Sequence, residues 1–100
     1  MDSMLLKGNR NEGDLIRFHG RIGENIKEAR EALLCSQKEI SELSGISQSQ
    51  LSRIEAGERG ASLYRLAKIA EALKVSPGDL IEQNPRSQFS SKKAISNATI

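Results

Sequence analysis

The sequence contains few of the residues on which most catalytic and metal sites depend. Its 100 residues include one cysteine, Cys35, and one histidine, His19. A single cysteine excludes an internal disulfide, and these two side chains provide too few ligands for a zinc site of ordinary spacing. Because no set of acid, base and nucleophile converges, we expect no enzymatic activity, no metal, no cofactor and no small-molecule ligand.

Long apolar runs and aromatic side chains are also scarce. No apolar stretch approaches the roughly 18 residues that a membrane span needs, and Met4–Leu6 is much shorter than a signal-peptide core. We therefore expect a cytoplasmic protein without a membrane partner. Aromatic residues make up 3% of the chain and hydrophobic residues 37%, and the latter are mostly Leu, Ile and Ala. This composition favours helices over a β-rich core, so it predicts an all-α fold.

The charges nearly balance, and the positive excess is local. The formal net charge is +2, and residues 20–82 contain nine basic and ten acidic side chains. The last 18 residues carry Arg86, Lys92 and Lys93 and no acidic residue. Together with their Ser and Asn content, this indicates a flexible basic tail over residues 84–100, which is either simply solvated or in contact with phosphates.

The beginning of the chain lacks a clear helical pattern. Four glycine and asparagine residues interrupt the first 13 positions. We therefore predict a flexible N-terminal arm over residues 1–19. A helical rhythm follows, carried by Ile22, Ile26, Ala29 and Leu33. Leu15 and Phe18 would extend the same face by two turns, whereas Gly20 and Gly23 weaken the prediction of where this helix begins.

Two capping boxes predict two short helices joined by a tight turn. In Ser36–Glu39 the serine hydroxyl and the glutamate carboxylate each accept from a backbone N–H, and the helix that follows ends at Gly45. Ser47–Gln50 repeats the pattern two residues later, and Leu51 and Ile54 form the inner face of its helix. Helices joined so closely must cross at a large angle.

Two further helices complete the predicted domain, which spans residues 20–83. Ser62 caps a helix whose expected inner face consists of Leu63, Leu66, Ala67, Ala70 and Leu73. Ser76, Pro77 and Asp79 are typical of the start of a short fifth helix, because proline is tolerated in the first turn and an acid is favourable there. In the helix that begins after Ser36, the apolar residues are Ile40 and Leu43.

Residues 35–57, CSQKEISELSGISQSQLSRIEAG, resemble the helix-turn-helix of the Xre, or lambda-repressor-like, family. The resemblance extends over roughly residues 20–82. Ser41 stands where this family generally has alanine, and Ala61 stands where a proline commonly precedes the fourth helix. The resemblance implies a compact five-helix DNA-binding domain in which the helix from Gln48 to Ala56 enters the major groove of double-stranded DNA.

The side chains at the start of that helix suit base recognition. At about 100° per residue, the outward positions include Ser49, Ser52 and Arg53, and Gln48 lies at the exposed end. Glutamine can pair with adenine, serine can donate or accept, and arginine can bind guanine through two hydrogen bonds. We place phosphate contacts at Gln37 and Arg59 and assign Gln50 mainly to the capping box. The predicted DNA-binding residues are Gln37, Ser47, Gln48, Ser49, Gln50, Arg53 and Arg59.

Three other residues have structural interpretations. The resemblance implies that Arg30 and Glu55 form a partly buried ion pair, which we interpret as structural because a buried charge needs its partner. Cys35 is expected to be a small buried hydrophobic residue rather than a redox thiol. His19 is expected at a helix end or on the surface.

The function implied is that of a sequence-specific transcriptional regulator, with repression as the expected action. It would bind an inverted repeat as a homodimer that uses Ile81 and the fifth helix, helped by Leu15, Ile16 and Phe18. A phage-type repressor, a restriction-modification controller and an antitoxin all remain open. An alternative of another class is a protein-interaction module that uses the same helices to dock a protein partner.

Overall fold

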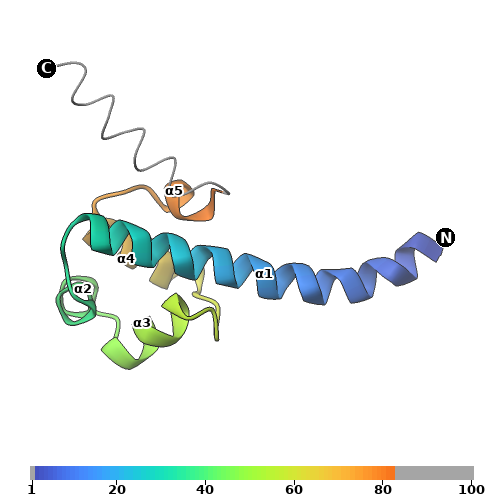
Figure 1. The fold of residues 1–100 in the computed structure, drawn as a ribbon, viewed down its shortest axis with the longest axis horizontal. Helices are drawn as coiled ribbons and strands as arrows, with labels where there is room; N and C mark the ends of the chain where they lie inside the picture. The colour runs from blue at the N-terminus through green and yellow to red at the C-terminus, as the bar shows by residue number, and fades with distance from the viewer. Residues whose placement is uncertain (1, 83–100) are drawn as a thin grey trace, which may run out of the picture.

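The computed structural model describes the backbone of residues 2–82 and the side chains of residues 13–82 (Figure 1). The secondary structure of this part of the chain is entirely helical. Its elements are α1 (Asp2–Ala32), α2 (Gln37–Ser44), α3 (Gln48–Glu55), α4 (Leu63–Leu73) and α5 (Pro77–Ile81). The predicted all-α fold with five helices is therefore confirmed.

Helix α1 begins much earlier than expected. The sequence pattern predicts an irregular arm up to residue 19, but the backbone is helical without interruption from Asp2 to Ala32. The C-terminal half of α1 packs on the bundle and so supplies the nucleus, after which each added residue gains one hydrogen bond. Figure 1 shows the first turns of α1 extending beyond the other helices. The division into an arm, a domain and a tail stays a prediction, and residues 84–100 lie outside the described part.

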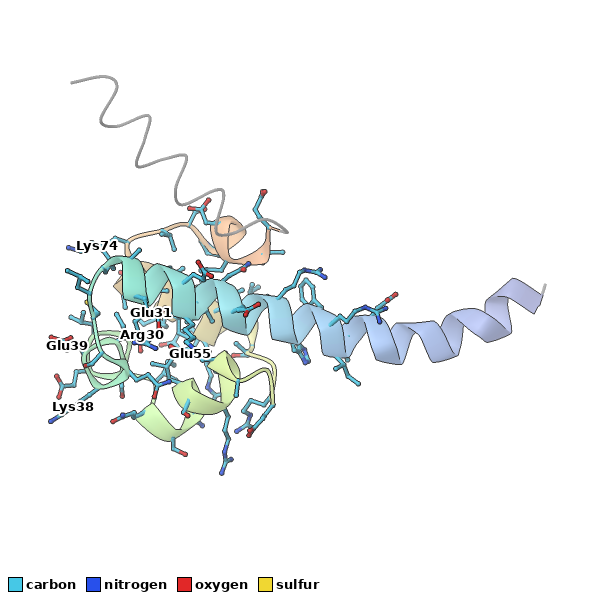
Figure 2. All side chains as sticks on the ribbon, in the orientation of Figure 1. Arg30, Glu31, Lys38, Glu39, Glu55 and Lys74 are labelled. Carbon is cyan, nitrogen blue, oxygen red and sulfur yellow. The ribbon has the colours of Figure 1, made fainter. Side chains whose placement is uncertain are left out.

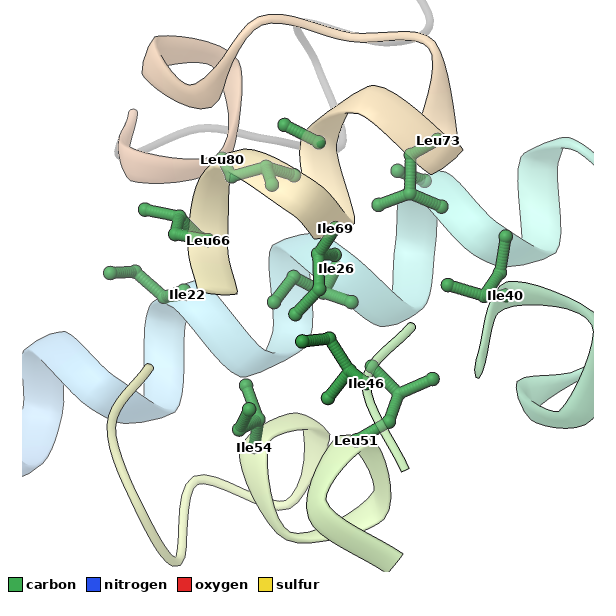
Figure 3. Packing of buried hydrophobic residues seen from close by; sticks show 12 residues of the cluster. Ile22, Ile26, Ile40, Ile46, Leu51, Ile54, Leu66, Ile69, Leu73 and Leu80 are labelled. Carbon is green, nitrogen blue, oxygen red and sulfur yellow. The ribbon is translucent and has the colours of Figure 1, made fainter. Parts of the chain in front are cut away.

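One hydrophobic core joins all five helices (Figure 3). Each Leu or Ile that is fully buried there contributes roughly 1.5–3 kcal/mol to folding. Ile46, from the turn between α2 and α3, packs in the same cluster. The buried hydrophobic residues are Ile22, Ile26, Ala29, Ile40, Ile46, Leu51, Ile54, Leu66, Ile69, Ala70, Leu73 and Leu80.

Some predicted core positions are wrong. Leu63 is 80% exposed, and Ala67 also faces solvent. Ile69, absent from the predicted inner face of α4, is fully buried. Leu63 is the first residue of α4 and lies beyond the edge of the core. Compared with the predicted inner face, the buried face of α4 is rotated away from Ala67 and toward Ile69.

The predicted helix ends are largely confirmed. Both halves of the capping box are formed at Ser36 and at Ser76, and Gly45 ends α2 with a φ of 79° in the left-handed region that favours glycine. The capping box predicted at Ser47–Gln50 is only half formed: the Ser47 hydroxyl accepts from the backbone N–H of Gln50, but in the described part of the chain the Gln50 side chain does not complete the box. In each of these short helices, the cap serine therefore satisfies one of the first-turn N–H donors that have no partner within the helix.

A fully buried asparagine that the sequence pattern missed attaches α5 to α1. The amide nitrogen of Asn25 donates to the carbonyl oxygens of Leu80, at 2.6 Å, and Glu82, at 2.9 Å. Because these carbonyls lie at the end of α5, they have no partner within that helix. Asn25 thus fixes where the fifth helix ends against the first.

Candidate nucleic-acid interface

Helix α3 has an apolar inner face and a polar outer face. Leu51 and Ile54 are buried in the core. The exposed side chains of the helix and its cap are Ser47, Gln48, Ser49, Ser52 and Arg53. Gln50 is half-buried. The structure thus brings five of the polar residues considered in the sequence onto one outer surface, and their contact with DNA stays a prediction.

The turn before α3 is held by two serines of α2. The Ser41 hydroxyl donates to the carbonyl oxygen of Ile46 at 2.6 Å, and the buried Ser44 hydroxyl accepts from the backbone N–H of Ile46 at 3.1 Å. Ile46 itself is buried. Serine in place of the alanine usual in the family therefore adds a hydrogen bond across the turn, and the turn sets the direction in which α3 leaves α2.

A buried ion pair holds α3 against α1 (Figure 2). The Arg30 guanidinium donates to both oxygens of the Glu55 carboxylate, at 2.7 and 2.9 Å, and to the carbonyl oxygen of Cys35 at 2.9 Å. The side chains of Arg30 and Glu55 are 12% and 5% exposed. The hydrogen bond with Glu55 raises the pKa of Arg30 above its ordinary value, although burial acts in the opposite direction. The ion pair expected from the resemblance is confirmed.

Gln37 is part of the same network. Its amide nitrogen donates to a carboxylate oxygen of Glu55 at 3.0 Å, so the first residue of α2 is tied to the last residue of α3. The amide nitrogen has two hydrogens, so one N–H remains available to an external acceptor. The structure therefore gives Gln37 a structural role, and the predicted phosphate contact remains untested beside it.

Arg59 is exposed in the loop between α3 and α4. The same loop packs against α1 at Gly60, a contact that the sequence analysis did not predict. The ring of His19 fills the space beside Gly60. A Cβ added at Gly60 would overlap the His19 Nε2 atom and lie 2.8 Å from its Cε1 atom. His19 thus lies within α1 against the loop, and not at a helix end.

Within the described side chains, neither Cys35 nor the acidic residues form a metal-binding cluster. Cys35 is half-buried and packs against the core, as expected for a small hydrophobic residue. Among residues 13–82, no group of three or more His, Cys, Asp or Glu side chains is placed to hold a metal ion. None of the described helices is both long and apolar enough to cross a membrane.

The chain is similar to known regulators over the same helices. A family model described as helix-turn-helix matches residues 26–80. The HTH-type transcriptional regulator y4dJ of Sinorhizobium fredii is 31% identical over 71 residues, which cover 71% of this chain and 92% of that protein. The restriction-modification controller protein C.AhdI from Aeromonas hydrophila superposes with a TM-score of 0.61 and 34% identity, over 62% of this chain and 94% of that structure. The chain shares this fold and these sequence similarities, and it belongs to the Xre-like helix-turn-helix family of DNA-binding transcriptional regulators.

Proposed function

We propose that the protein is a sequence-specific transcriptional repressor that binds an inverted repeat in double-stranded DNA as a homodimer. The observation that carries this proposal is the row of exposed polar side chains on α3, above a fully buried inner face. Gln48, Ser49 and Arg53 would read base edges in the major groove, because their side chains offer the donors and acceptors that bases require. Ser47 lies at the exposed start of the same helix.

Other residues would fix the register of the protein on the DNA backbone. Arg59 is exposed in the loop after α3, and Gln37 keeps an N–H available at the start of α2. Contacts to phosphates orient a protein without carrying sequence information. Gln50 is half-buried at the start of α3 and would support the helix more than read a base.

A homodimer would compensate for the weak overall charge. The near balance of acidic and basic residues provides little nonspecific attraction to DNA. Affinity must therefore come from the outer surface of α3 and from the second copy of that surface in the dimer. Ile81 of α5 is 39% exposed, and Leu15 and Ile16 of α1 are 53% and 69% exposed. These apolar side chains are the proposed dimer contacts, whereas Phe18, also expected to help, is partly buried and packs against the core.

Selection of bound duplexes from a random pool tests the function and the symmetry together. We expect an enriched inverted repeat whose half-sites lie about 34–36 Å apart, or one helical turn. Sedimentation at micromolar concentration should give a dimer. A pool without enrichment would favour the alternative, a protein-interaction module or an antitoxin that acts through a protein partner, and a monomer would contradict the dimer.

Substitution of Gln48 by alanine should relax recognition at one position of each half-site. We expect specific binding to weaken by about 1–3 kcal/mol, because the lost side chain reads a base, while melting of the protein is unchanged. Repeating the selection with the variant and measuring Kd for the enriched duplex would show this. Glu71→Ala, at an exposed position of α4, is the matched control and should keep the wild-type preference. An unchanged base preference in Gln48→Ala would remove Gln48 from the reading surface.

A further inference from the structure

The loop between α3 and α4 touches α1 on either side of Arg59. At Gly57 the two backbones lie so close that an added Cβ would come within 3.0 Å of the Gly20 Cα atom. Three residues later, a Cβ added at Gly60 would overlap the ring of His19. Arg59 lies between these two contacts, and its side chain is exposed. The way in which the loop rests on α1 therefore sets the position from which Arg59 extends.

The two halves of this loop are held in different ways. The backbone N–H groups of Gly57 and Glu58 donate to carbonyl oxygens of α3, at 3.0 and 2.9 Å, so the first half is attached by the main chain. Within residues 13–82, the backbone of Arg59 and Gly60 forms no such hydrogen bond. The second half of the loop therefore depends on its contact with the side chain of His19.

Without that contact, the backbone around Gly60 would be free to move. Glycine has no Cβ and can adopt more backbone conformations than any other residue type. Ala61 follows it and, unlike a proline, does not fix its own φ. Ala61 packs against the core and so holds the end of the loop. Arg59 and Gly60 remain as the two residues that only His19 restrains.

The His19 ring is a firm support because the core lies behind it. The side chain is half-buried, and its ring centroid lies 6.3 Å from that of Phe18, within the range of interacting aromatic pairs. Phe18 packs against the hydrophobic core. Both residues belong to α1, which continues as a helix in both directions. The ring is thus fixed by α1 and by Phe18, and Gly60 rests against it.

We propose that His19 is a positioning residue for DNA binding, whose ring holds Gly60 so that the loop presents Arg59 in one position before the DNA arrives. The inference rests on the proposed function, in which Arg59 contacts the DNA. Ordering a loop or a long side chain during association lowers affinity, so a loop that is already ordered binds more tightly. His19 itself touches no DNA and acts through Arg59.

His19→Ala tests the proposal, because it removes the ring atoms that contact Gly60. Kd for the enriched duplex is measured at a temperature at which urea unfolding shows the variant to be folded. We expect Kd to rise by about twofold to tenfold for each protomer bound, the effect expected for ordering one long side chain. His19→Phe is the matched control. It keeps a ring at the same position and should restore most of the wild-type affinity.

A double-mutant cycle with Arg59→Ala separates positioning from a general structural role. If His19 acts through Arg59, His19→Ala should add no further loss of affinity to that of Arg59→Ala. A general structural role would instead weaken binding by the same factor in both backgrounds, and this result would overturn the proposal. So would an Arg59→Ala variant that binds as tightly as the wild type.

Gly60→Ala disturbs the same contact from the loop, and it provides the test if His19→Ala does not fold. Its added Cβ would displace the His19 ring, so Kd should rise by a similar factor, and only where Arg59 is present. Wild-type affinity in either folded variant would overturn the positioning role and leave the proposed function intact. A wild-type protein that enriches no duplex would overturn both.

Discussion

Gly23→Ala should melt far below the wild type, with the free energy of unfolding lowered by about 3 kcal/mol, which is at the upper end for overpacking. At Gly23 the α1 backbone meets the end of α3. A Cβ added at this position would overlap the carbonyl oxygen of Ile54 and lie 2.6 Å from that of Glu55. Both obstacles are backbone atoms and cannot rotate away. The helices would have to separate, and the core and the Arg30–Glu55 pair would be disturbed together.

Gly20→Ala is the matched control on the same helix. A Cβ added at Gly20 meets no atom within 4 Å. Because glycine destabilises a helix interior, alanine at this position should raise the free energy of unfolding by up to about 1 kcal/mol. Urea unfolding of both variants measures the two effects. If both substitutions changed the free energy of unfolding in the same direction, the packing of α1 on α3 would not require a glycine at position 23.

Glu55→Ala should have an effect of similar size for a different reason. Removing the carboxylate leaves the Arg30 guanidinium buried without its counterion and leaves Gln37 without an acceptor. The loss of one partner from a buried ion pair typically lowers the free energy of unfolding by about 3–5 kcal/mol. Thermal melting should therefore give a melting temperature well below that of the wild type. At temperatures where the variant is still folded, its base preference should be unchanged. A wild-type melting temperature would contradict a structural role for Glu55.

The double variant Arg30→Met with Glu55→Ala separates the two contributions. If the unpaired charge causes the loss, removing it as well should recover part of the stability, so the double variant should be more stable than Glu55→Ala alone. If the double variant were less stable than Glu55→Ala, the hydrogen bond from Arg30 to the carbonyl oxygen of Cys35 would matter more than the charge of Arg30. Both proteins can be compared by the same urea unfolding measurement.

The ends of the short helices were readable from the chain because their causes are local. A serine cap and the acid three residues later act within one turn, and Gly45 ends α2 through its own backbone conformation. The outward position of Gln48, Ser49 and Arg53 followed from helical geometry alone. The Arg30–Glu55 pair was expected only because of the family resemblance, since 25 positions separate its members.

The tertiary structure decided what depends on segments far apart in the chain. Gly23 weakened the prediction of where the first helix begins, yet it is the place where α3 approaches α1. No sequence pattern singled out Asn25, yet its side chain binds the end of α5. Leu63 was assigned to the core, but the core ends before it.

The sequence by itself therefore determined the all-α class, most helix ends and the polar surface of α3. Those features arise from capping, glycine conformation and periodicity, which act over a few residues. The buried face of α4 and the close approach of α3 to α1 at Gly23 were decided by packing. Packing depends on which side chains meet across the core, and local patterns do not contain those distances.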